Sequence, residues 1–301
     1  MAGFDEKKLE GAVLARLGRA KDPRFRKVMS SLVKHLHAFV REVELTEEEW
    51  LQGVQFLTAT GQKCDDKRQE FILLSDLLGV SMLVDAINHR ASTGETDSTV
   101  LGPFFVEGAP KLKHGDSIAR NGGSDPTLVR GRVLDAKQRP IAGAVIDVWQ
   151  TGSDATYDVQ RPGFQGMDMR GQFVSGEDGR FEFRTVKPRS YPVPTDGPCG
   201  DMLRAMRHHA RRPAHIHFMI AAPGYERLIT HLFVDGDPYI DSDAVFGVKS
   251  SLIADFKRHG SKREAEQLDM PSPFFTVDYE FALKRARAGA KARGVWAAKA
   301  A

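Results

Sequence analysis

The sequence predicts an α+β protein with a mostly β core, in which an antiparallel β-sandwich follows an N-terminal helical region. Through roughly the first hundred residues, apolar side chains recur at helical spacing. From Thr127 the apolar period falls to two, and short apolar runs alternate with turns that contain Gly or Pro, a pattern typical of sandwiches. We therefore expect a helical region over residues 1–105, a connector over 106–126, a β-sandwich over 127–275 and a C-terminal tail over 276–301.

Two helices are expected near the N-terminus, each with a recognisable start. Asp22 suits an N-cap and Pro23 suits the first helical position, and apolar residues then recur at helical spacing over Phe25–Val43. Thr46 and Glu49 have the spacing of a capping box, which predicts a second helix that continues to about residue 61.

A third, long helix is expected over Asp66–Asn88. It is apolar over much of its surface, which indicates a helix that is deeply buried or shared with a partner. Asp76 stands out on it, because a carboxylate among leucines is costly to bury without a partner. The apolar segment Ser98–Phe105 that follows is interrupted by Gly102-Pro103, so we expect a turn there.

The second half of the chain contains the expected strands. Apolar and polar residues alternate in runs that are separated by turn residues, and Gly176–Gly179 suits a hairpin turn. The expected strands are Val129–Val133, Ala144–Trp149, Gln172–Val174, Arg180–Phe183, Ala214–Ile220 and Leu228–Val234.

The strand Ala214–Ile220 contains a His-x-His pair. Because successive side chains of a strand alternate between its two faces, His215 and His217 point the same way, while Ile216 and Phe218 point into a core. Two imidazoles on a rigid strand make half of a metal site. Taken alone, however, the pattern favours one core histidine and one surface histidine.

Composition and charge exclude several classes of protein. The sequence has 43 Lys and Arg against 40 Asp and Glu, a net charge of +3, which does not favour a nucleic-acid partner. Two cysteines cannot form a disulfide framework. No run approaches the roughly 18 apolar residues of a membrane span, and the first residues lack the apolar run of a signal peptide. We expect a soluble cytoplasmic protein with no membrane partner.

Two of the five tyrosines lie in unusual loops. Tyr157 follows the strand Ala144–Trp149, and Tyr191 lies among prolines that fix its backbone. Two phenolates with two imidazoles differ from the thiolate-rich sets of structural zinc sites. They suit a hard ion such as ferric iron, because anionic oxygen stabilises the higher oxidation state. Together with His215 and His217, these tyrosines would leave a coordination position open.

The order of Tyr157, Tyr191 and the run Arg212-x-x-His215-x-His217 is highly specific as a set. With it, the chain resembles the intradiol ring-cleaving dioxygenases, above all the hydroxyquinol 1,2-dioxygenase branch. The resemblance covers most of the second half and extends to the helical N-terminal region, which matches the dimerising domain of the family. The stretches that carry it are Ser98–Phe104, Gly131–Tyr157, Gly171–Phe183, Tyr191–Pro194, Arg212–Phe218 and Gly236–Lys249.

This resemblance implies a role for each residue of the set. Tyr157, Tyr191, His215 and His217 would bind Fe(III), with hydroxide as a fifth ligand. Tyr191 and His217 match the axial pair, and Tyr157 and His215 match the equatorial pair. Tyr191 would also leave the metal and accept a substrate proton. Arg212 would lie over the substrate ring and stabilise its developing negative charge.

The same resemblance implies the reaction and the substrate contacts. O2 would cleave hydroxyquinol (benzene-1,2,4-triol) between its two adjacent hydroxylated carbons to give 3-hydroxy-cis,cis-muconate or maleylacetate. Core packing would explain the aliphatic contacts nearly as well as substrate binding. The positions that resemble substrate contacts of the family are Leu73, Asp76, Val100, Gly102, Pro103, Phe104, Val193, Pro194 and Val245.

The family resemblance also implies partners. It predicts a homodimer through the N-terminal helices, with a phospholipid in an apolar tunnel at the interface. One position departs from the pattern of catechol-cleaving relatives, which commonly have a glutamine where this chain has His231.

Three other functions remain open at this stage. A catechol or chlorocatechol 1,2-dioxygenase would use the same iron ligands. The segment Gly131–Val145 also resembles transthyretin-like domains, which suggests a non-catalytic β-sandwich binding module. A zinc hydrolase could use His215, His217 and one of His208 and His209.

Overall fold

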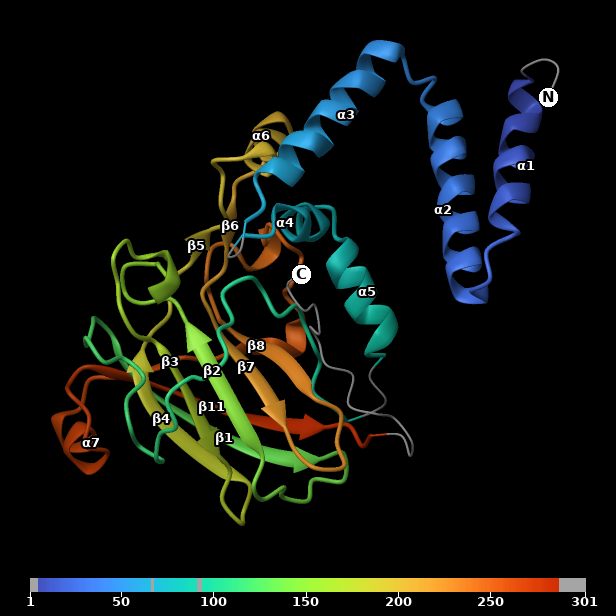
Figure 1. The fold of residues 1–301 in the computed structure, drawn as a ribbon. Helices are drawn as coiled ribbons and strands as arrows, with labels where there is room; N and C mark the ends of the chain where they lie inside the picture. Colours follow the sequence, from blue (N-terminus) through green and yellow to red (C-terminus); the bar gives the residue numbers. More distant parts are fainter. Residues whose placement is uncertain (1–4, 66–67, 91–93, 287–301) are drawn as a thin grey trace. The chain divides into compact units, whose positions relative to one another are not determined.

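The computed structural model describes residues 5–65, 68–90 and 94–286. It has the predicted α+β class, with helices first and β-sheets in the second half of the chain (Figure 1). The chain divides into two compact units, Met1–Gln62 and Lys63–Ala301, so the division falls before residue 105, where we expected the helical region to end. Within the described residues, no helix has the length and apolar character needed to cross a membrane.

The first unit consists of helices with the predicted starts. Its elements are α1 (Glu6–Leu17), α2 (Pro23–Glu42) and α3 (Glu47–Gln62). Asp22 caps α2 by accepting hydrogen bonds from the backbone N–H groups of residues 24 and 25. At α3, Glu49 accepts from the backbone N–H of Thr46 at 2.9 Å, and Thr46 Oγ1 accepts from that of Glu49 at 3.2 Å, which confirms the capping box.

The single long helix expected over Asp66–Asn88 is wrong. The described part of this segment forms two helices, α4 (Glu70–Leu77) and α5 (Val80–Asn88). They are separated at Gly79, whose φ of 70° lies in the left-handed region that glycine adopts without steric cost. Asp76 is buried on α4, one turn after Leu73, and both lie in the second unit.

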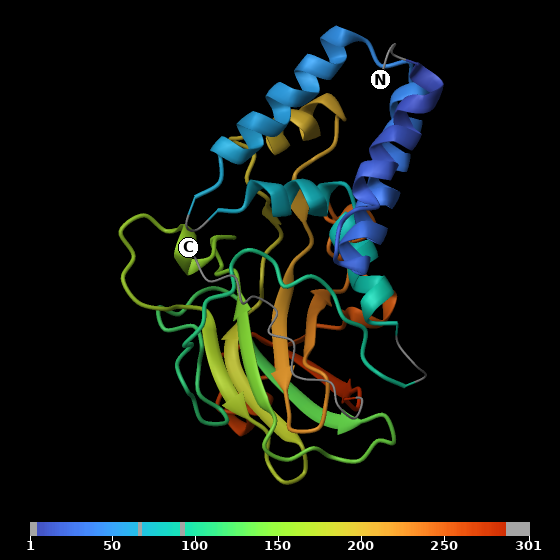
Figure 2. The same ribbon diagram turned by 45° about the vertical axis from the view of Figure 1, so that its right-hand side comes forward.

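The β-strands form two main sheets that pack face to face (Figures 1 and 2). One has the order β10-β11-β1-β4 and the other β3-β2-β7-β8-β9, while β5 and β6 form a small separate ribbon. Their shared core includes Val129 and Phe183 of the first sheet with Ile146, Ile216 and Phe218 of the second. The strands are β1 (Pro126–Asp135), β2 (Val145–Gln150), β3 (Arg170–Val174), β4 (Arg180–Val186), β5 (Tyr191–Pro192), β6 (Arg211–Arg212), β7 (His215–Ala221), β8 (Leu228–Val234), β9 (Ile253–Ala254), β10 (Lys257–His259) and β11 (Phe274–Leu283).

Two features of these sheets differ from the prediction. We expected the C-terminal tail to begin at residue 276, but β11 continues to Leu283. Residues 287–301 of the expected tail lie outside the described part. Val277, Phe281 and Leu283 follow the period of two and pack in the core. The sheets are also not purely antiparallel, since β1 pairs with β11, and β8 with β9, in parallel.

The remaining elements lie in the connections of the second unit. The region expected as a connector has no strand before Pro126, where β1 begins, and it meets the sheets through isolated bridges, Lys111 with Gln172 and Ser117 with Arg184. The other short helices are α6 (Pro198–Ala205), α7 (Lys262–Gln267), η1 (Asp158–Gln160), η2 (Ile240–Ser242) and η3 (Ser250–Leu252).

Candidate metal centre

A row of buried side chains crosses the five-stranded sheet. Arg170 of β3 pairs in register with Trp149 of β2, Trp149 with His217 of β7, and His217 with His231 of β8. Because residues opposite one another in a ladder share a face, these four side chains lie on the same side of the sheet. His215 lies two residues before His217 and shares that face. The opposite face of β7 packs into the sandwich core, as the sequence predicted.

Three imidazoles come together at the centre of this row. The Nε2 atoms of His215 and His217 are 3.1 Å apart. The ring of His231 stacks on His215 at a centroid distance of 4.6 Å and meets His217 edge-on at 4.1 Å. The ring of Trp149 stacks on that of His217 at a centroid distance of 4.6 Å. We call His215, His217 and His231 the imidazole cluster; one ring nitrogen of each lies within 4.8 Å of the others.

Both predicted tyrosines lie against this cluster. The hydroxyl of Tyr157 is 2.8 Å from Nε2 of His217. The ring of Tyr191 meets that of Tyr157 edge-on at 5.2 Å and lies 5.6 Å from the ring of His215. The structure therefore brings together the two tyrosines and two histidines, although three separate segments carry them. The ligand role of these residues stays a prediction.

The electrostatics of the cluster follow from its burial. Burial lowers the pKa of His215 to about 3, and the charge of Arg212 acts in the same direction. Burial likewise lowers the pKa of His217 and of His231, with further contributions from neighbouring positive groups. Burial raises the pKa of Tyr157 above its ordinary value. Near neutral pH the three imidazoles are therefore uncharged, which is the form that binds metals.

The donor atoms fit a metal ion. Nδ1 of His215 lies 2.7 Å from the backbone oxygen of Pro213, which fixes the ring and leaves Nε2 directed at the cluster. Metal-binding histidines commonly use their second nitrogen in this way. Nε2 of His217 faces both Nε2 of His215 and the hydroxyl of Tyr157. Imidazole nitrogen and phenol oxygen thus converge on one buried point, a set suited to an oxidised transition metal.

Arg212 lies beside the cluster and is held by an acid that the sequence analysis missed. Its Nη1 is 3.5 Å from Nε2 of His215. Its Nε and Nη2 donate to the two carboxylate oxygens of Asp243 at 3.1 and 3.2 Å. Asp243 also accepts from the backbone N–H groups of Val245 and Gly247. The only available signal was indirect: a buried guanidinium needs an anion, but several aspartates could have supplied it.

Several predicted substrate contacts adjoin the tyrosines and histidines. Phe104 stacks on Tyr157 at 4.4 Å and meets Tyr191 edge-on at 6.2 Å. Gly102 has a φ of 75°, and a Cβ there would lie 3.3 Å from Cε1 of His217, so only glycine combines this conformation with this contact. Val245 is buried and its N–H binds the acid that holds Arg212.

The other predicted contacts differ in burial. Leu73 and Val193 are buried, Val100 and Pro194 are half-buried, and Pro103 is exposed. Burial raises the pKa of Asp76, while a hydrogen bond from Ser81 and the charge of Arg212 act against this shift. Asp76 is thus a buried acid near Arg212, rather than a residue on a solvated face of its helix.

His208 and His209 lie outside the cluster. His208 is exposed, and its Nδ1 is 2.7 Å from the backbone oxygen of His209. His209 contacts Ser242 Oγ through Nε2 at 2.9 Å. Among the described residues, the third imidazole beside His215 and His217 is His231. The zinc site with His208 or His209 is therefore wrong.

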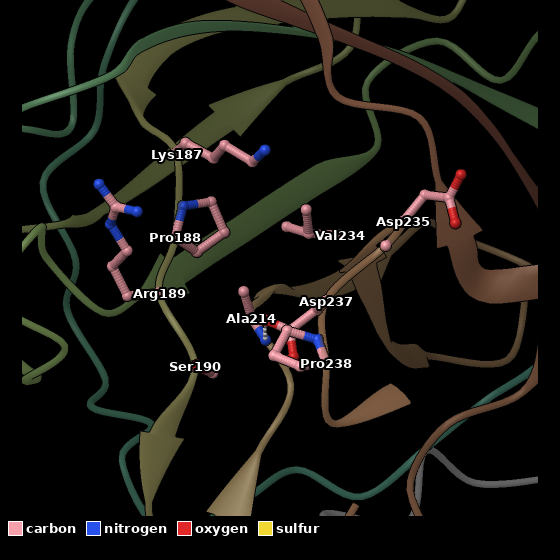
Figure 3. Close-up of a pocket in the computed structure, with 10 residues that line it drawn as sticks. Lys187, Pro188, Arg189, Ser190, Ala214, Val234, Asp235, Asp237 and Pro238 are labelled. Carbon is pink, nitrogen blue, oxygen red and sulfur yellow. Dashed lines mark hydrogen bonds between the residues drawn. The ribbon is translucent and has the colours of Figure 1, made fainter. Parts of the chain in front are cut away.

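A separate cavity of about 240 Å³ lies between residues 187–190 and 234–238 (Figure 3). Lys187 and Arg189 lie on one side of it and Asp235 and Asp237 on the other, so its lining has both charges. Asp237 accepts a hydrogen bond from the backbone N–H of Ala214 at 3.1 Å. None of the predicted metal ligands lines this cavity.

Comparisons with known proteins agree with this arrangement. Residues 22–96 match a family model described as the catechol dioxygenase N terminus, and residues 100–285 match one described as dioxygenase. The chain is 55% identical over 258 residues to a 6-chlorohydroxyquinol 1,2-dioxygenase of Cupriavidus pinatubonensis, which covers 86% of this chain and 94% of that protein. It is 50% identical over 284 residues to a hydroxyquinol 1,2-dioxygenase of a Rhizobium species, covering 94% and 96% respectively. The solved structure of hydroxyquinol 1,2-dioxygenase from Pseudomonas putida DLL-E4 is 53% identical, with a TM-score of 0.88 over 93% of this chain and 99% of that chain.

The contact between Arg212 and Asp243 predicts a large effect of a small substitution. Asp243→Asn keeps the shape of the side chain but leaves a buried guanidinium without its anion, so the free energy of unfolding should fall by about 3–5 kcal/mol. Urea unfolding of the purified protein measures this. The double variant Arg212→Met/Asp243→Asn removes the unpaired charge and should recover part of the loss. If the loss in the double variant equals the sum of the losses in Arg212→Met and Asp243→Asn, the two residues are not coupled.

Proposed function

We propose that this chain, which belongs to the intradiol ring-cleavage dioxygenase family, acts on hydroxyquinol. O2 would cleave benzene-1,2,4-triol between its two adjacent hydroxylated carbons to give 3-hydroxy-cis,cis-muconate, or maleylacetate as its keto form. The observation that carries the proposal is the convergence of the Tyr157 hydroxyl on the paired Nε2 atoms of His215 and His217. The names of the two relatives at 50 and 55% identity support the substrate class.

We propose Fe(III) as the metal and Tyr157, Tyr191, His215 and His217 as its ligands. Support comes from the donor set, two phenols and two neutral imidazoles in a buried site, which suits a hard oxidised ion. When bound, the ferric ion supplies Lewis acidity, which withdraws electron density from the diol ring and makes it reactive towards O2. As a ligand Tyr191 would be a phenolate, and its oxygen would accept a proton from the substrate to become a neutral phenol.

Arg212 would supply electrostatic stabilisation. Its guanidinium is buried, and Asp243 holds it in one orientation through two hydrogen bonds. A fixed cation in a dry site stabilises negative charge that develops on a ring far better than it would in water. The stacked rings of Phe104 and Tyr157 would help to exclude water from the same space.

Asp76 would distinguish hydroxyquinol from catechol. Support comes from its burial and from its interaction with the charges of Arg212 and Asp243, which both affect its pKa. The third hydroxyl of hydroxyquinol could donate a hydrogen bond to it. Catechol lacks this donor and would leave Asp76 with one hydrogen bond fewer, so the site would discriminate against catechol.

A chlorinated hydroxyquinol is a second candidate substrate. The relative at 55% identity is named for 6-chlorohydroxyquinol, and this favours a chlorinated triol over the catechol or chlorocatechol that the sequence left open. The non-catalytic transthyretin-like module is wrong, because the chain belongs to a family of enzymes. Oxygen uptake by the purified protein with hydroxyquinol, 6-chlorohydroxyquinol, catechol and 4-chlorocatechol tests the substrate class directly.

The four-ligand site predicts about one iron per chain and a visible tyrosinate-to-iron band that dithionite bleaches. His215→Ala and His217→Ala should each lose the metal, because one of four ligands is removed. His231→Gln is the matched control: it changes the third imidazole of the cluster and should retain iron. Elemental analysis and the visible spectrum give both answers. Loss of iron in His231→Gln as complete as in His217→Ala would favour a three-imidazole site instead.

Asp76→Leu should lower kcat/KM for hydroxyquinol by about ten- to a hundredfold, because one hydrogen bond to a charged acceptor is worth roughly 1.5–3 kcal/mol. Activity on catechol should be spared or improved. Leu74→Ala serves as a control, since it shortens another buried side chain of the same helix without removing an acceptor. An unchanged ratio of the two substrates in Asp76→Leu would remove Asp76 as the specificity residue.

We also propose a homodimer through the N-terminal helices, with a phospholipid at the interface. Support comes from α2, whose exposed apolar side chains follow helical spacing. A cavity of about 500 Å³ beside them is lined by apolar side chains together with polar and charged ones of both signs, which would contact the chain and the headgroup of a lipid. Its lining residues are Glu6, Leu9, His37, Val40, Arg41, Glu44 and Leu45. The exposed apolar side chains of α2 are Phe25, Val28, Leu32, Leu36, Phe39 and Val40.

Sedimentation at micromolar concentration should give a dimer for the wild type and a monomer for Leu36→Asp, because a charge at the centre of an apolar interface is costly to bury. Lys34→Asp introduces the same charge at an exposed polar position of α2 and should remain dimeric. A monomeric wild type would refute the dimer. Mass spectrometry of an organic extract tests the lipid separately.

A further inference from the structure

We propose that Arg170 is a positioning residue that fixes the Tyr157 phenol against the imidazole cluster. It would act through two other segments, by binding the carboxylate of Asp158 and the backbone carbonyl of Phe104. The inference about iron binding rests on the proposed function, whereas the link between the segments can be tested on the metal-free protein.

Arg170 is placed where it can reach both segments. It is the first residue of β3, it is buried, and it lies at the end of the row that passes through Trp149 to His217. Its Nε donates to Oδ2 of Asp158 at 2.7 Å, and its Nη2 donates to Oδ1 of the same carboxylate. Its Nη1 donates to the backbone oxygen of Phe104 at 3.0 Å. One planar guanidinium thus joins two segments.

Both acceptors adjoin the rings that meet at the site. Asp158 directly follows Tyr157 in the chain, and Phe104 carries the ring that stacks on Tyr157 at 4.4 Å with an interplanar angle of 26°. Neither Tyr157 nor Phe104 lies in a strand, so no ladder of backbone hydrogen bonds fixes them. The Arg170 guanidinium instead connects both segments to β3, through the Asp158 carboxylate beside Tyr157 and through the backbone oxygen of Phe104.

The segment of Tyr157 is held on its other side as well. Asp158 accepts hydrogen bonds from the backbone N–H groups of Val159 at 2.8 Å and of Asp168 at 3.1 Å. The side-chain oxygen of Gln160 accepts from the backbone N–H of Tyr157 at 2.9 Å. With its backbone held at these points, the Tyr157 hydroxyl is directed to Nε2 of His217.

The chemistry of the contact favours positioning over net stability. Asp158 and Arg170 are each about 2% exposed in their side chains, and a buried ion pair of this kind gains little free energy after desolvation. The pair instead fixes the orientation of both groups, because the guanidinium binds both oxygens of the carboxylate and still has a donor for a carbonyl. Lysine retains the charge but cannot reproduce this three-acceptor pattern.

Arg170→Lys, Arg170→Met and a control, Arg161→Met, separate positioning from general stability. Arg161 lies on the same segment, and its side chain pairs with Asp154 and Asp168 and contacts Thr156 Oγ1 at 3.5 Å. Among the described contacts, this side chain makes no hydrogen bond to the Asp158 carboxylate or to Phe104; only its backbone N–H donates to the backbone oxygen of Asp158. The double variant Arg170→Met/Asp158→Leu removes both buried charges and serves if the single variants unfold. For each protein we would measure melting temperature, amide hydrogen exchange of the metal-free form, iron dissociation, the visible band, kcat and KM.

We expect Arg170→Lys and Arg170→Met to exchange faster than Arg161→Met at residues 101–105 and 155–160. Iron should dissociate about 10- to 100-fold faster, the visible band should shift, and kcat should fall more than KM rises, since support of a metal ligand is typically worth this much. Exchange and iron retention equal to those of Arg161→Met would overturn the proposal. If the wild type holds no iron, the proposed metal fails, and exchange of the metal-free protein still decides the role of Arg170.

Discussion

The alternation of side chains along β7 is the constraint on which the site depends. Ile216 and Phe218 are fully buried in the sandwich core, and this fixes His215 and His217 on the opposite face. A shift of one residue in the register of β7 would exchange the two sets, so the packing of the core also fixes the side of the sheet on which the imidazoles lie. The pairing of β7 with β2 and β8 then adds Trp149 and the third imidazole at defined positions. The geometry of the candidate metal centre therefore depends on the packing of the hydrophobic core.

Two buried ion pairs adjoin the residues of the candidate site, and each allows a charged guanidinium to be buried. Arg212 with Asp243, and Arg170 with Asp158, each place a guanidinium in a dry region only because a carboxylate accepts two of its hydrogen bonds. Both carboxylates also accept backbone N–H groups, so each pair is tied to a loop. Such pairs contribute little net stability and much orientation, which is what a site assembled from loops requires.

Much of the fold could be predicted from the sequence, because local patterns encode it. The apolar period of two predicted six strands, β1 to β4, β7 and β8, and Thr46 with Glu49 marked the start of α3. The break at Gly79 was missed because the apolar pattern continues across it, and only the backbone angle separates α4 from α5. The position of β11 in the sheet, parallel to β1, depends on pairing between segments more than 140 residues apart, which no local pattern encodes. The same limit applies to the site. The order of the motif singled out the four proposed ligands. The acids that bind the two arginines were missed, because Asp243 lies 31 residues from Arg212 and Asp158 lies 12 residues from Arg170.

The buried acids of this region fall into two groups, those that form an ion pair with an arginine and one that does not. Asp243 and Asp158 each face a guanidinium, and their charges are satisfied within the protein. Asp76 is buried to a similar degree, yet within residues 5–65, 68–90 and 94–286 it forms no ion pair, and burial raises its pKa. Ser81 donates one hydrogen bond to it, and because a carboxylate can accept several, a further donor would lower the cost of its burial. A substrate with a third hydroxyl would supply this further donor and a diol would not, so Asp76 is where discrimination between the two would arise. Asp243 and Asp158 would set the geometry that both substrates share.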